Sequence, residues 1–327
     1  MKIALIADIL TTTALEYEAD IYRITPLNYK LILKFWNPNI LFVESAWQGH
    51  KNRWKYKIAD YPDYPRRSNN KLAQVVAYAK KLGIPTVFWN KEDGVHFNRF
   101  IKSAKLFEHI FTVDENCIPR YRKVVNDDIT INTLMFAIQP KIHAFTGFNF
   151  KYNHVNFVGS YSQHIHENRR KWQDMIFDAV CECDLKLTIW DRNSQRKAAD
   201  YRYPSKKCIT VNPTVPYEET GVIYKEYLVS LNVNTIQDSE TMYSRRLIEI
   251  LACGGIVVSN ASMAIEKYFK EYCYVVSSTE EAQKIMKRLK NGSNDEDLAR
   301  AKAGAEYVAR EHTWAHRLKE IQRVVGI

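Results

Sequence analysis

Residues 244–260, SRRLIEILACGGIVVSN, combine two arginines and a glutamate with a helix-like pattern of apolar residues. On a helix Arg246 and Glu249 lie three residues apart and share one face. Arginine is a bidentate donor to phosphate, and a carboxylate can accept hydrogen bonds from two ribose hydroxyls. Arg245, Arg246 and Glu249 could therefore hold a nucleoside diphosphate, or they could form an ordinary ion pair on an exposed helix face.

The neighbouring residues predict where this helix begins. The strand-like run SLNVN ends at Asn234, and a polar loop joins it to the helix. Ligands of parallel α/β sheets bind beyond the carboxyl ends of the strands, where the N–H groups of a helix N-terminus attract phosphate. Gly159-Ser160 and Arg192 also follow strand-like runs, so we expect them at the same edge. Each also has a plain interpretation, a turn with a helix cap for Gly159-Ser160 and an ion pair with Asp191 for Arg192.

Asn232 and Asn234 lie at that edge too, where they could line the ligand site or satisfy backbone groups at a strand end.

A second group of reactive side chains follows another strand-like run, in FWNKEDGVHF. Glu92, Asp93 or His96 could act there as a general base, or they could cap the next helix. Glu44 and His50, after the preceding strand in VESAWQGH, are rival candidates.

The motifs of several common enzyme classes are absent from the sequence. It contains no G-x-x-x-x-G-K-[ST], no G-x-G-x-x-G after the first strand, no G-x-S-x-G and no H-E-x-x-H. The acids at 295–297 are better explained as helix-capping residues than as metal ligands. The six cysteines form no C-x-x-C pair, so we expect free thiols in a reducing compartment and no zinc site.

Strand-like and helix-like segments alternate along the chain. The runs KIALIAD, NILFVES, TVFWN and IFTVDE form a first series, with an amphipathic helix predicted in KLAQVVAYAKKLG. A second series begins at VNFVGSY, after the turn-prone stretch at 140–155. Short apolar strands separated by helices indicate parallel, doubly wound sheets. The predicted fold class is α/β, with two Rossmann-like domains facing across a cleft.

The segment TMYSRRLIEILACGGIVVSN resembles the nucleotide-sugar segment of GT-B glycosyltransferases of the group-1 superfamily, whose pattern is roughly R-x-x-E-x-x-A-x-G-x-[PV]-V. The similarity is greatest to the spore-maturation (CgeB-type) branch. It extends to VNFVGSY, LNVNT, FWNKEDGVHFNRF and the terminal HTWAHR. The resemblance implies a glycosyltransferase that moves a sugar from a nucleotide-diphosphate donor to a hydroxyl of a glycan, a lipid-linked molecule or another anionic acceptor.

By this resemblance Glu249 binds the donor ribose, and Arg246, with Arg245, binds the diphosphate. The usual family pattern has a second acid eight positions before the glutamate, but this chain has Thr241 there, beside Glu240. This departure leaves the contacts of the donor sugar and the stereochemistry of transfer open.

The resemblance also implies a division of labour between domains. Residues 1–150 would receive the acceptor and supply the base from Glu92, Asp93 or His96. Residues 151–305 would bind the nucleotide sugar, and the helix at 306–327 would return to the first domain. Such enzymes usually neutralise the leaving diphosphate with a helix dipole and basic side chains. We therefore expect no metal and no cofactor, and a UDP-sugar as donor.

The net charge of +10 is concentrated in the first half of the chain, where 21 Lys and Arg face 14 Asp and Glu. The basic and aromatic stretch 49–71 suits partners that carry phosphate, such as an anionic membrane or nucleic acid. No apolar run is long enough for a membrane span, and the N-terminus reads as a strand, so a cytoplasmic location is expected, with peripheral contact at the inner membrane face. The alternatives are a DNA-modifying glycosyltransferase and a non-catalytic protein that binds nucleotide sugars.

Overall fold

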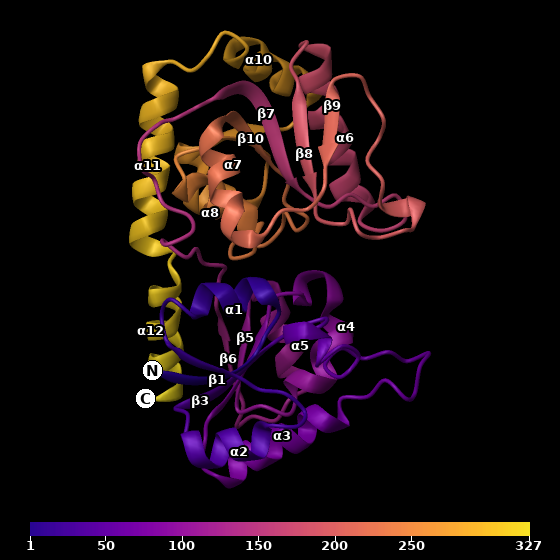
Figure 1. Ribbon diagram of the computed structural model, residues 1–327, viewed down its shortest axis with the longest axis vertical. Helices are drawn as coiled ribbons and strands as arrows, with labels where there is room; N and C mark the ends of the chain where they lie inside the picture. Colours follow the sequence, from indigo (N-terminus) through magenta and orange to yellow (C-terminus); the bar gives the residue numbers. More distant parts are fainter. The chain divides into compact units, whose positions relative to one another are not determined.

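The computed structural model describes all residues 1–327 (Figure 1). The chain divides into two compact units. The N-terminal unit comprises Met1–Phe136 together with Trp314–Ile327, and the C-terminal unit comprises Ala137–Thr313. The last helix of the chain therefore belongs to the N-terminal unit. None of the helices combines the length and the apolar character that a membrane span requires.

The N-terminal unit is built on a six-stranded parallel sheet in the order β2-β1-β3-β4-β5-β6. The strands β3 and β4 at its centre are buried along their whole length, because helices cover both faces of such a sheet. The strands are β1 (Lys2–Ile6), β2 (Asp20–Arg23), β3 (Ile40–Glu44), β4 (Thr86–Asn90), β5 (His109–Thr112) and β6 (Thr130–Thr133). The helices are α1 (Ile9–Leu15), α2 (Tyr29–Leu31) with the π-helical η1 (Ile32–Trp36), α3 (Asn70–Lys81), α4 (Asp93–Ala104), α5 (Ile118–Arg122) and α12 (Trp314–Val325).

The C-terminal unit has its own six-stranded parallel sheet, in the order β12-β11-β10-β7-β8-β9. Its strands are β7 (Tyr152–Gly159), β8 (Leu187–Asp191), β9 (Ile209–Asn212), β10 (Tyr227–Asn232), β11 (Ile256–Asn260) and β12 (Tyr274–Val276). Its helices are α6 (Glu167–Glu182), α7 (Thr220–Glu226), α8 (Arg245–Ala252), α9 (Met263–Tyr268), α10 (Thr279–Leu289) and α11 (Asp295–Glu311). The predicted pair of doubly wound α/β sheets is confirmed.

Each sheet contains a point where the strand order reverses. The first sheet grows from β1 to β2 and then continues on the other side of β1 with β3. The second grows from β7 through β8 to β9 and then continues on the other side of β7 with β10. Loops diverge at such a point and leave a crevice at the carboxyl ends of the strands, where α/β proteins bind ligands. The residues after β1, β3, β7 and β10 therefore lie where proteins of this class bind ligands.

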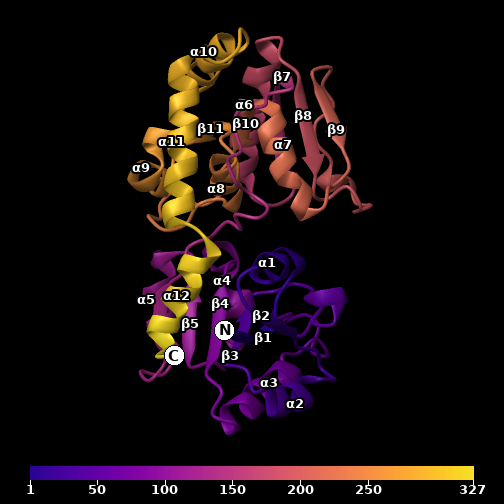
Figure 2. The same ribbon diagram turned by 60° about the vertical axis from the view of Figure 1, so that its left-hand side comes forward.

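The helix α8 is not a surface helix. Every residue from Arg246 to Ala252 is buried, and α11 packs against α8 (Figure 2). The helix ends at Ala252 and is followed by Gly254, whose φ of +75° is the left-handed value typical of a residue that follows a helix. A Cβ at Gly254 would also lie 2.4 Å from the Phe145 ring. The polar side chains of α8 therefore need partners inside the protein, which excludes a solvated ion-pair face.

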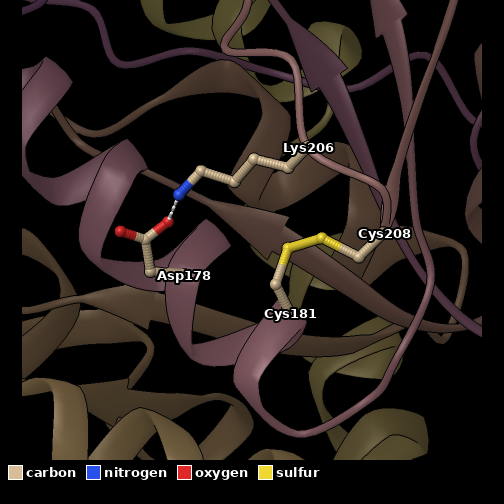
Figure 3. Close-up of a disulfide and its surroundings, with 4 residues drawn as sticks. All are labelled: Asp178, Cys181, Lys206 and Cys208. Atoms are coloured by element: carbon tan, nitrogen blue, oxygen red, sulfur yellow. Dashed lines mark hydrogen bonds and ion pairs between the residues drawn. A yellow bond between two sulfur atoms is a disulfide. The ribbon is translucent and has the colours of Figure 1, made fainter.

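The prediction of six free thiols is wrong for one pair of cysteines. Cys181, in the last turn of α6, and Cys208, just before β9, form a disulfide with a Cα–Cα distance of 5.5 Å (Figure 3). An ion pair between Asp178 and Lys206 joins the same two segments beside it. The pairing arises because β8 and β9 are neighbouring parallel strands, so the end of α6 lies beside the chain that enters β9. The other four cysteines are free and buried.

Candidate functional site

The loop between β10 and α8 is held by asparagines. The Asn234 carboxamide oxygen accepts a hydrogen bond from the N–H of Ser244, the residue before α8, at 2.8 Å. The backbone of Asn234 in turn bonds the side chain of Asn260 at the end of β11. Asn232 donates to the Ser259 hydroxyl at 2.9 Å. Both candidate asparagines are fully buried, so they position the start of α8 and satisfy backbone groups.

Arg246 reaches from α8 to the carboxyl end of β7. Its Nε donates to the carbonyl oxygen of Val158 at 2.5 Å, and the centre of its guanidinium lies 4.3 Å from the centre of the Phe157 ring. Gly159 makes this approach possible, because a Cβ there would lie 2.5 Å from Phe157 and 2.9 Å from the Arg246 guanidinium. The structure thus brings Arg246 and Gly159 together at the reversal point of the second sheet.

Glu249 pairs with Arg245, one turn before it. Arg245 Nε lies 2.9 Å from Glu249 Oε1, close enough for an ion pair. The observed ion pair joins Arg245 and Glu249, which are four residues apart. The sequence had instead suggested that Arg246 and Glu249, three residues apart, share one face of the helix. Burial alone would raise the pKa of Glu249, but the positive charges of Arg245, Arg192 and Arg246 outweigh it and lower the pKa. The buried carboxylate is held in its ionised form.

Two further arginines extend the cluster. Arg192 follows β8, and its backbone N–H donates to the Gly159 carbonyl at 2.8 Å. Arg169, in the first turns of α6, donates to the Ser160 carbonyl at 2.9 Å. Burial and then the charge of Arg246 lower the pKa of Arg169 to about 10. The alternative ion pair between Arg192 and Asp191 does not form, because Asp191 instead faces Arg202 at 3.9 Å.

We call Arg169, Arg192, Arg245, Arg246 and Glu249 the arginine cluster. It contains four positive charges and one negative charge. The neighbouring carboxylate of Asp191 faces Arg202 and does not belong to the cluster. Two of its buried nitrogens, Arg246 Nη1 and Arg169 Nε, have no hydrogen-bond acceptor. An unsatisfied buried donor costs about 1–3 kcal/mol, and its presence in a native fold calls for an explanation. A bound anion would satisfy both nitrogens and reduce the surplus of positive charge.

His143 adds a buried imidazole next to the cluster. Its Nε2 lies 2.8 Å from the Thr220 hydroxyl, while Nδ1 has no partner. Burial lowers the pKa of His143 to about 4, although the charge of Glu249 acts in the opposite direction. The ring packs against Tyr217 at a centroid distance of 5.2 Å. His143 is therefore neutral at physiological pH.

Thr241 lies in the loop before α8 and is buried, with its N–H donating to the Ser239 hydroxyl at 3.3 Å. The neighbouring Glu240 is turned outward and pairs with Lys267. Neither residue therefore supplies the second acid of the family pattern.

The three predicted catalytic residues of the N-terminal unit lie in different environments. Asp93 begins α4 and is 0% exposed, and its carboxylate accepts a hydrogen bond from the Tyr121 hydroxyl at 3.0 Å. Burial raises the pKa of Asp93 to about 8. Glu92, one residue earlier, is partly exposed. His96 is also partly exposed and meets the Trp47 ring edge-on at 5.3 Å, and burial followed by the charge of Arg99 lowers its pKa.

The rival residue Glu44 lies at the reversal point of the first sheet. It is fully buried, and Oε1 accepts hydrogen bonds from the Asp8 N–H at 2.6 Å and the Lys91 ammonium at 3.1 Å. Burial raises the pKa of Glu44, against the charge of Lys91. Asp8 accepts three backbone N–H bonds from residues 47–49. The Asp8–Glu44–Lys91 group therefore fixes the loop after β3.

The second rival, His50, lies in that loop with its Nδ1 3.3 Å from Arg23. Burial and the charge of Arg23 lower its pKa. No group of three or more His, Cys, Asp or Glu side chains in the chain lies together in a way that could hold a metal ion.

The family model described as "Glycosyl transferase-like" matches residues 155–323, just over half of the chain. The chain belongs to this family. The match contains every member of the arginine cluster, so the expected glycosyltransferase is confirmed at the level of the family. No curated protein sequence matches this glycosyl transferase-like chain significantly.

Solved structures share the fold of this glycosyl transferase-like chain over its whole length. An α-glucosyltransferase in complex with UDP and a 13-mer DNA has a TM-score of 0.66 at 10% identity, with 100% of this chain and 99% of that chain covered. T4 phage BGT in complex with UDP and Mn²⁺ has a TM-score of 0.61 at 14% identity and 100% of each chain. Anabaena Alr3699/HepE in complex with UDP and glucose has a TM-score of 0.58 at 11% identity, with 99% and 91% covered. The predicted GT-B fold is confirmed.

Sequence reasoning missed three parts of the site, Arg169, His143 and Tyr217. Arg169 carried a signal, because it follows the Gly159-Ser160 turn in the first turns of the next helix, where an arginine can reach back to the turn. His143 and Tyr217 carried none, since they lie 106 and 32 residues before Glu249, in a bend and in a short 3-10 helix. Only the packing of α7 and the chain around Ile142 brings them to α8.

Proposed function

We propose that this protein transfers a sugar from a nucleotide-diphosphate donor to an acceptor hydroxyl, and that the arginine cluster binds the donor. The observation that carries the proposal is the surplus of arginine around Glu249 at the carboxyl edge of the second sheet. The unsatisfied Arg246 and Arg169 nitrogens match a diphosphate, whose oxygens accept bidentate hydrogen bonds from guanidinium groups. Glu249, held ionised among arginines, can accept two ribose hydroxyls.

The backbone around Gly159 and Ser160 supports the same assignment. The absence of a Cβ at Gly159 leaves the Arg246 guanidinium next to the chain at the end of β7. The backbone N–H of Arg192 bonds the Gly159 carbonyl. The proposed anion site therefore draws on three segments, the end of β7, the end of β8 and the start of α8. Arg245 would orient Glu249, and the buried Thr241 would line the loop near the donor sugar.

We propose further that the leaving diphosphate is neutralised by arginines and not by a divalent cation. Preorganised positive groups stabilise the charge that develops on a leaving group without reorganising during the reaction. Four arginines supply that charge in the C-terminal unit. The test is the rate of donor turnover in EDTA compared with Mg²⁺ or Mn²⁺, since the proposal expects the same rate in all three.

For the general base we propose His96 or Glu92 in place of Asp93. A base must contact the acceptor hydroxyl, and Asp93 is sealed under Tyr121 and largely protonated at neutral pH. His96 is partly exposed, and its lowered pKa keeps the imidazole unprotonated at neutral pH, the form that can accept a proton. His96→Gln and Glu92→Gln should separate the two, because loss of the base lowers kcat while the donor affinity stays the same.

The donor is proposed to be a UDP-sugar, since several proteins that share the fold were solved with UDP. Thermal-shift measurements with UDP-, GDP-, CMP- and dTDP-sugars would identify it. A ligand at a hundred times its dissociation constant stabilises a protein by about 2.7 kcal/mol, which gives a clear shift. If none of these donors shifts the melting temperature, the donor-site proposal fails.

For the acceptor we propose a glycan or lipid-linked hydroxyl, because the positive charge in the first half of the chain suits a surface polysaccharide or a lipid-linked glycan. A DNA base is the second candidate, because one protein of similar fold was solved with DNA. Transfer to DNA should fall steeply between 50 and 200 mM salt, whereas transfer to a neutral glycan should not.

A further inference from the structure

A hollow of about 430 Å³ opens on the N-terminal unit, between residues 55–68 and the first turn of α3. We call it the basic hollow. Its lining includes Lys55, Lys57, Arg66, Arg67 and Lys71, and it includes no Asp or Glu.

The five cations have no carboxylate partners. None of them forms an ion pair, and Lys71 instead donates to the Gln74 carboxamide at 3.0 Å. Asp60, the acid nearest in sequence to Lys57, is occupied by Lys102 on α4 at 2.8 Å. A concave surface lined by uncompensated charge of one sign attracts the opposite charge strongly. The basic hollow therefore fits a phosphate-bearing group.

The loop that lines the hollow is anchored in the core. Trp54 is 1% exposed, and its indole N–H donates to the Ile24 carbonyl at 2.7 Å. The Arg67 guanidinium lies between two tyrosine rings, 4.0 Å from the centre of Tyr56 and 3.9 Å from the centre of Tyr64. Stacking of this kind fixes the plane of the arginine, which suits bidentate binding of phosphate.

Exposed apolar side chains occur on the neighbouring helical segment. Leu27, Leu31 and Phe35 are 82%, 62% and 73% exposed and recur every four residues, with Leu27 in the turn before α2, Leu31 at the end of α2 and Phe35 in η1. Lys30 and Lys34 alternate with them and are exposed as well. An apolar stripe next to lysines is typical of a helix that lies in a membrane interface.

The apolar stripe and the basic hollow adjoin. In both views α2 lies beside α3, whose first turn lines the hollow (Figures 1 and 2). The Tyr29 ring of α2 meets Tyr78 of α3 edge-on at 5.8 Å. The Lys71 ammonium, which belongs to the hollow, lies 5.3 Å from the centre of the Tyr29 ring.

We propose that the basic hollow and the apolar residues of α2 and η1 together bind an anionic membrane surface, with a lipid phosphate in the hollow. The backbone of nucleic acid would also suit the cations, but it would leave the exposed Leu31 and Phe35 without a role. Anionic lipid satisfies both features, because the headgroups meet the cations while the apolar side chains enter the acyl boundary. This inference is independent of the donor site, since vesicle binding requires no nucleotide sugar.

Flotation of the full chain with vesicles tests the proposal. The protein should bind vesicles of phosphatidylcholine with 30% phosphatidylglycerol and should not bind phosphatidylcholine alone. Arg66→Gln/Arg67→Gln should weaken the binding about 30-fold, since each basic residue near an anionic surface contributes a factor of about five. The matched control Lys284→Gln/Lys287→Gln removes the same charge from exposed positions on α10 and should bind like the wild type.

A second variant, Leu31→Ser/Phe35→Ser, tests the apolar part and should weaken binding at least tenfold without a change of charge. The proposal is overturned if the wild type does not bind the anionic vesicles in 50 mM salt. It is also overturned if both arginine and control variants weaken binding equally. The hollow would be assigned to nucleic acid instead if the protein binds a 30-bp DNA duplex more tightly than vesicles. That binding would have to depend on Arg66 and Arg67 but not on Leu31 and Phe35. Melting curves of each variant show that the fold is intact.

Discussion

Replacement of Glu249 by glutamine separates the binding of a ribose from the binding of a diphosphate. The substitution keeps the shape of the side chain but removes the only negative charge of the arginine cluster. Two hydrogen bonds from ribose hydroxyls to an ionised carboxylate contribute about 2 kcal/mol each, and the glutamine carboxamide oxygen keeps one neutral bond of about 1 kcal/mol, so about 3 kcal/mol is lost. We therefore expect the affinity for the UDP-sugar to fall about 150-fold.

Pyrophosphate should respond in the opposite direction. Without the carboxylate the cluster has four positive charges and no negative one, so an anion that lacks a ribose meets a more positive site. Its affinity should stay the same or rise. Isothermal titration calorimetry with UDP-sugar and with pyrophosphate, at one salt concentration, measures both effects on the same preparation.

The control must account for stability as well as binding. Removal of one partner from a buried ion pair costs about 3–5 kcal/mol, so Glu249→Gln should also melt at a lower temperature. Glu306→Gln removes a glutamate from an exposed pair of the same spacing, with Lys302 on α11, and should change neither stability nor binding. The reasoning is refuted if Glu249→Gln binds the UDP-sugar within threefold of the wild type. It is also refuted if both ligands weaken equally, because that result would mean a general collapse of the site.

Three further outcomes are expected. Gly159→Ala should destabilise the protein by about 1–3 kcal/mol and weaken donor binding, because the new Cβ would displace Phe157 and the Arg246 guanidinium. Urea titration measures the stability, and thermal shift with the donor measures the binding. The pKa of Asp93 is raised to about 8, so the folded state keeps a proton that the unfolded state loses above about pH 4. The free energy of unfolding should therefore fall by about 1.4 kcal/mol per pH unit from pH 5 to 7. Asp93→Asn should remove this dependence in urea titrations, and an unchanged slope would contradict the burial of a protonated carboxyl. Cys181→Ser/Cys208→Ser should cost about 3.5 kcal/mol through the closed loop of 27 residues, and non-reducing peptide mapping of the wild type should find the disulfide.

The sequence was informative where local chemistry decides the structure. Strand-like runs between helices predicted both sheets, and the polar loop after Asn234 predicted that α8 begins at a sheet edge. The arginines at 245 and 246 and the glutamate at 249 were found because a helix fixes their spacing. The choice of partner within the helix was not predictable, because Arg245 and Arg246 both lie within reach of Glu249 on a helix. The choice is made by Val158 and Phe157, which attract Arg246 to a strand 88 residues away.

Burial was the second property that the sequence could not supply. Asp93 looks like an exposed acid at the start of a helix, but Tyr121 from α5 closes over it. The disulfide has the same origin, since Cys181 and Cys208 have no spacing pattern and are joined only by the adjacency of β8 and β9. In each case the deciding contact comes from a different element of the sheet, so no local pattern in the sequence records it.

The unsatisfied nitrogens of the arginine cluster connect stability with binding. Arg246 is buried and Arg169 and Arg245 are partly buried around one carboxylate, so the fold carries unfavourable repulsion. It also has at least two buried donors, Arg246 Nη1 and Arg169 Nε, without acceptors. Such groups lower the stability of the unbound fold by about 1–3 kcal/mol each. A purely structural role would not maintain them, because leucine or methionine would fill the same volume at lower cost. A ligand that supplies the missing acceptors would return this free energy on binding, which is what the proposed diphosphate would do.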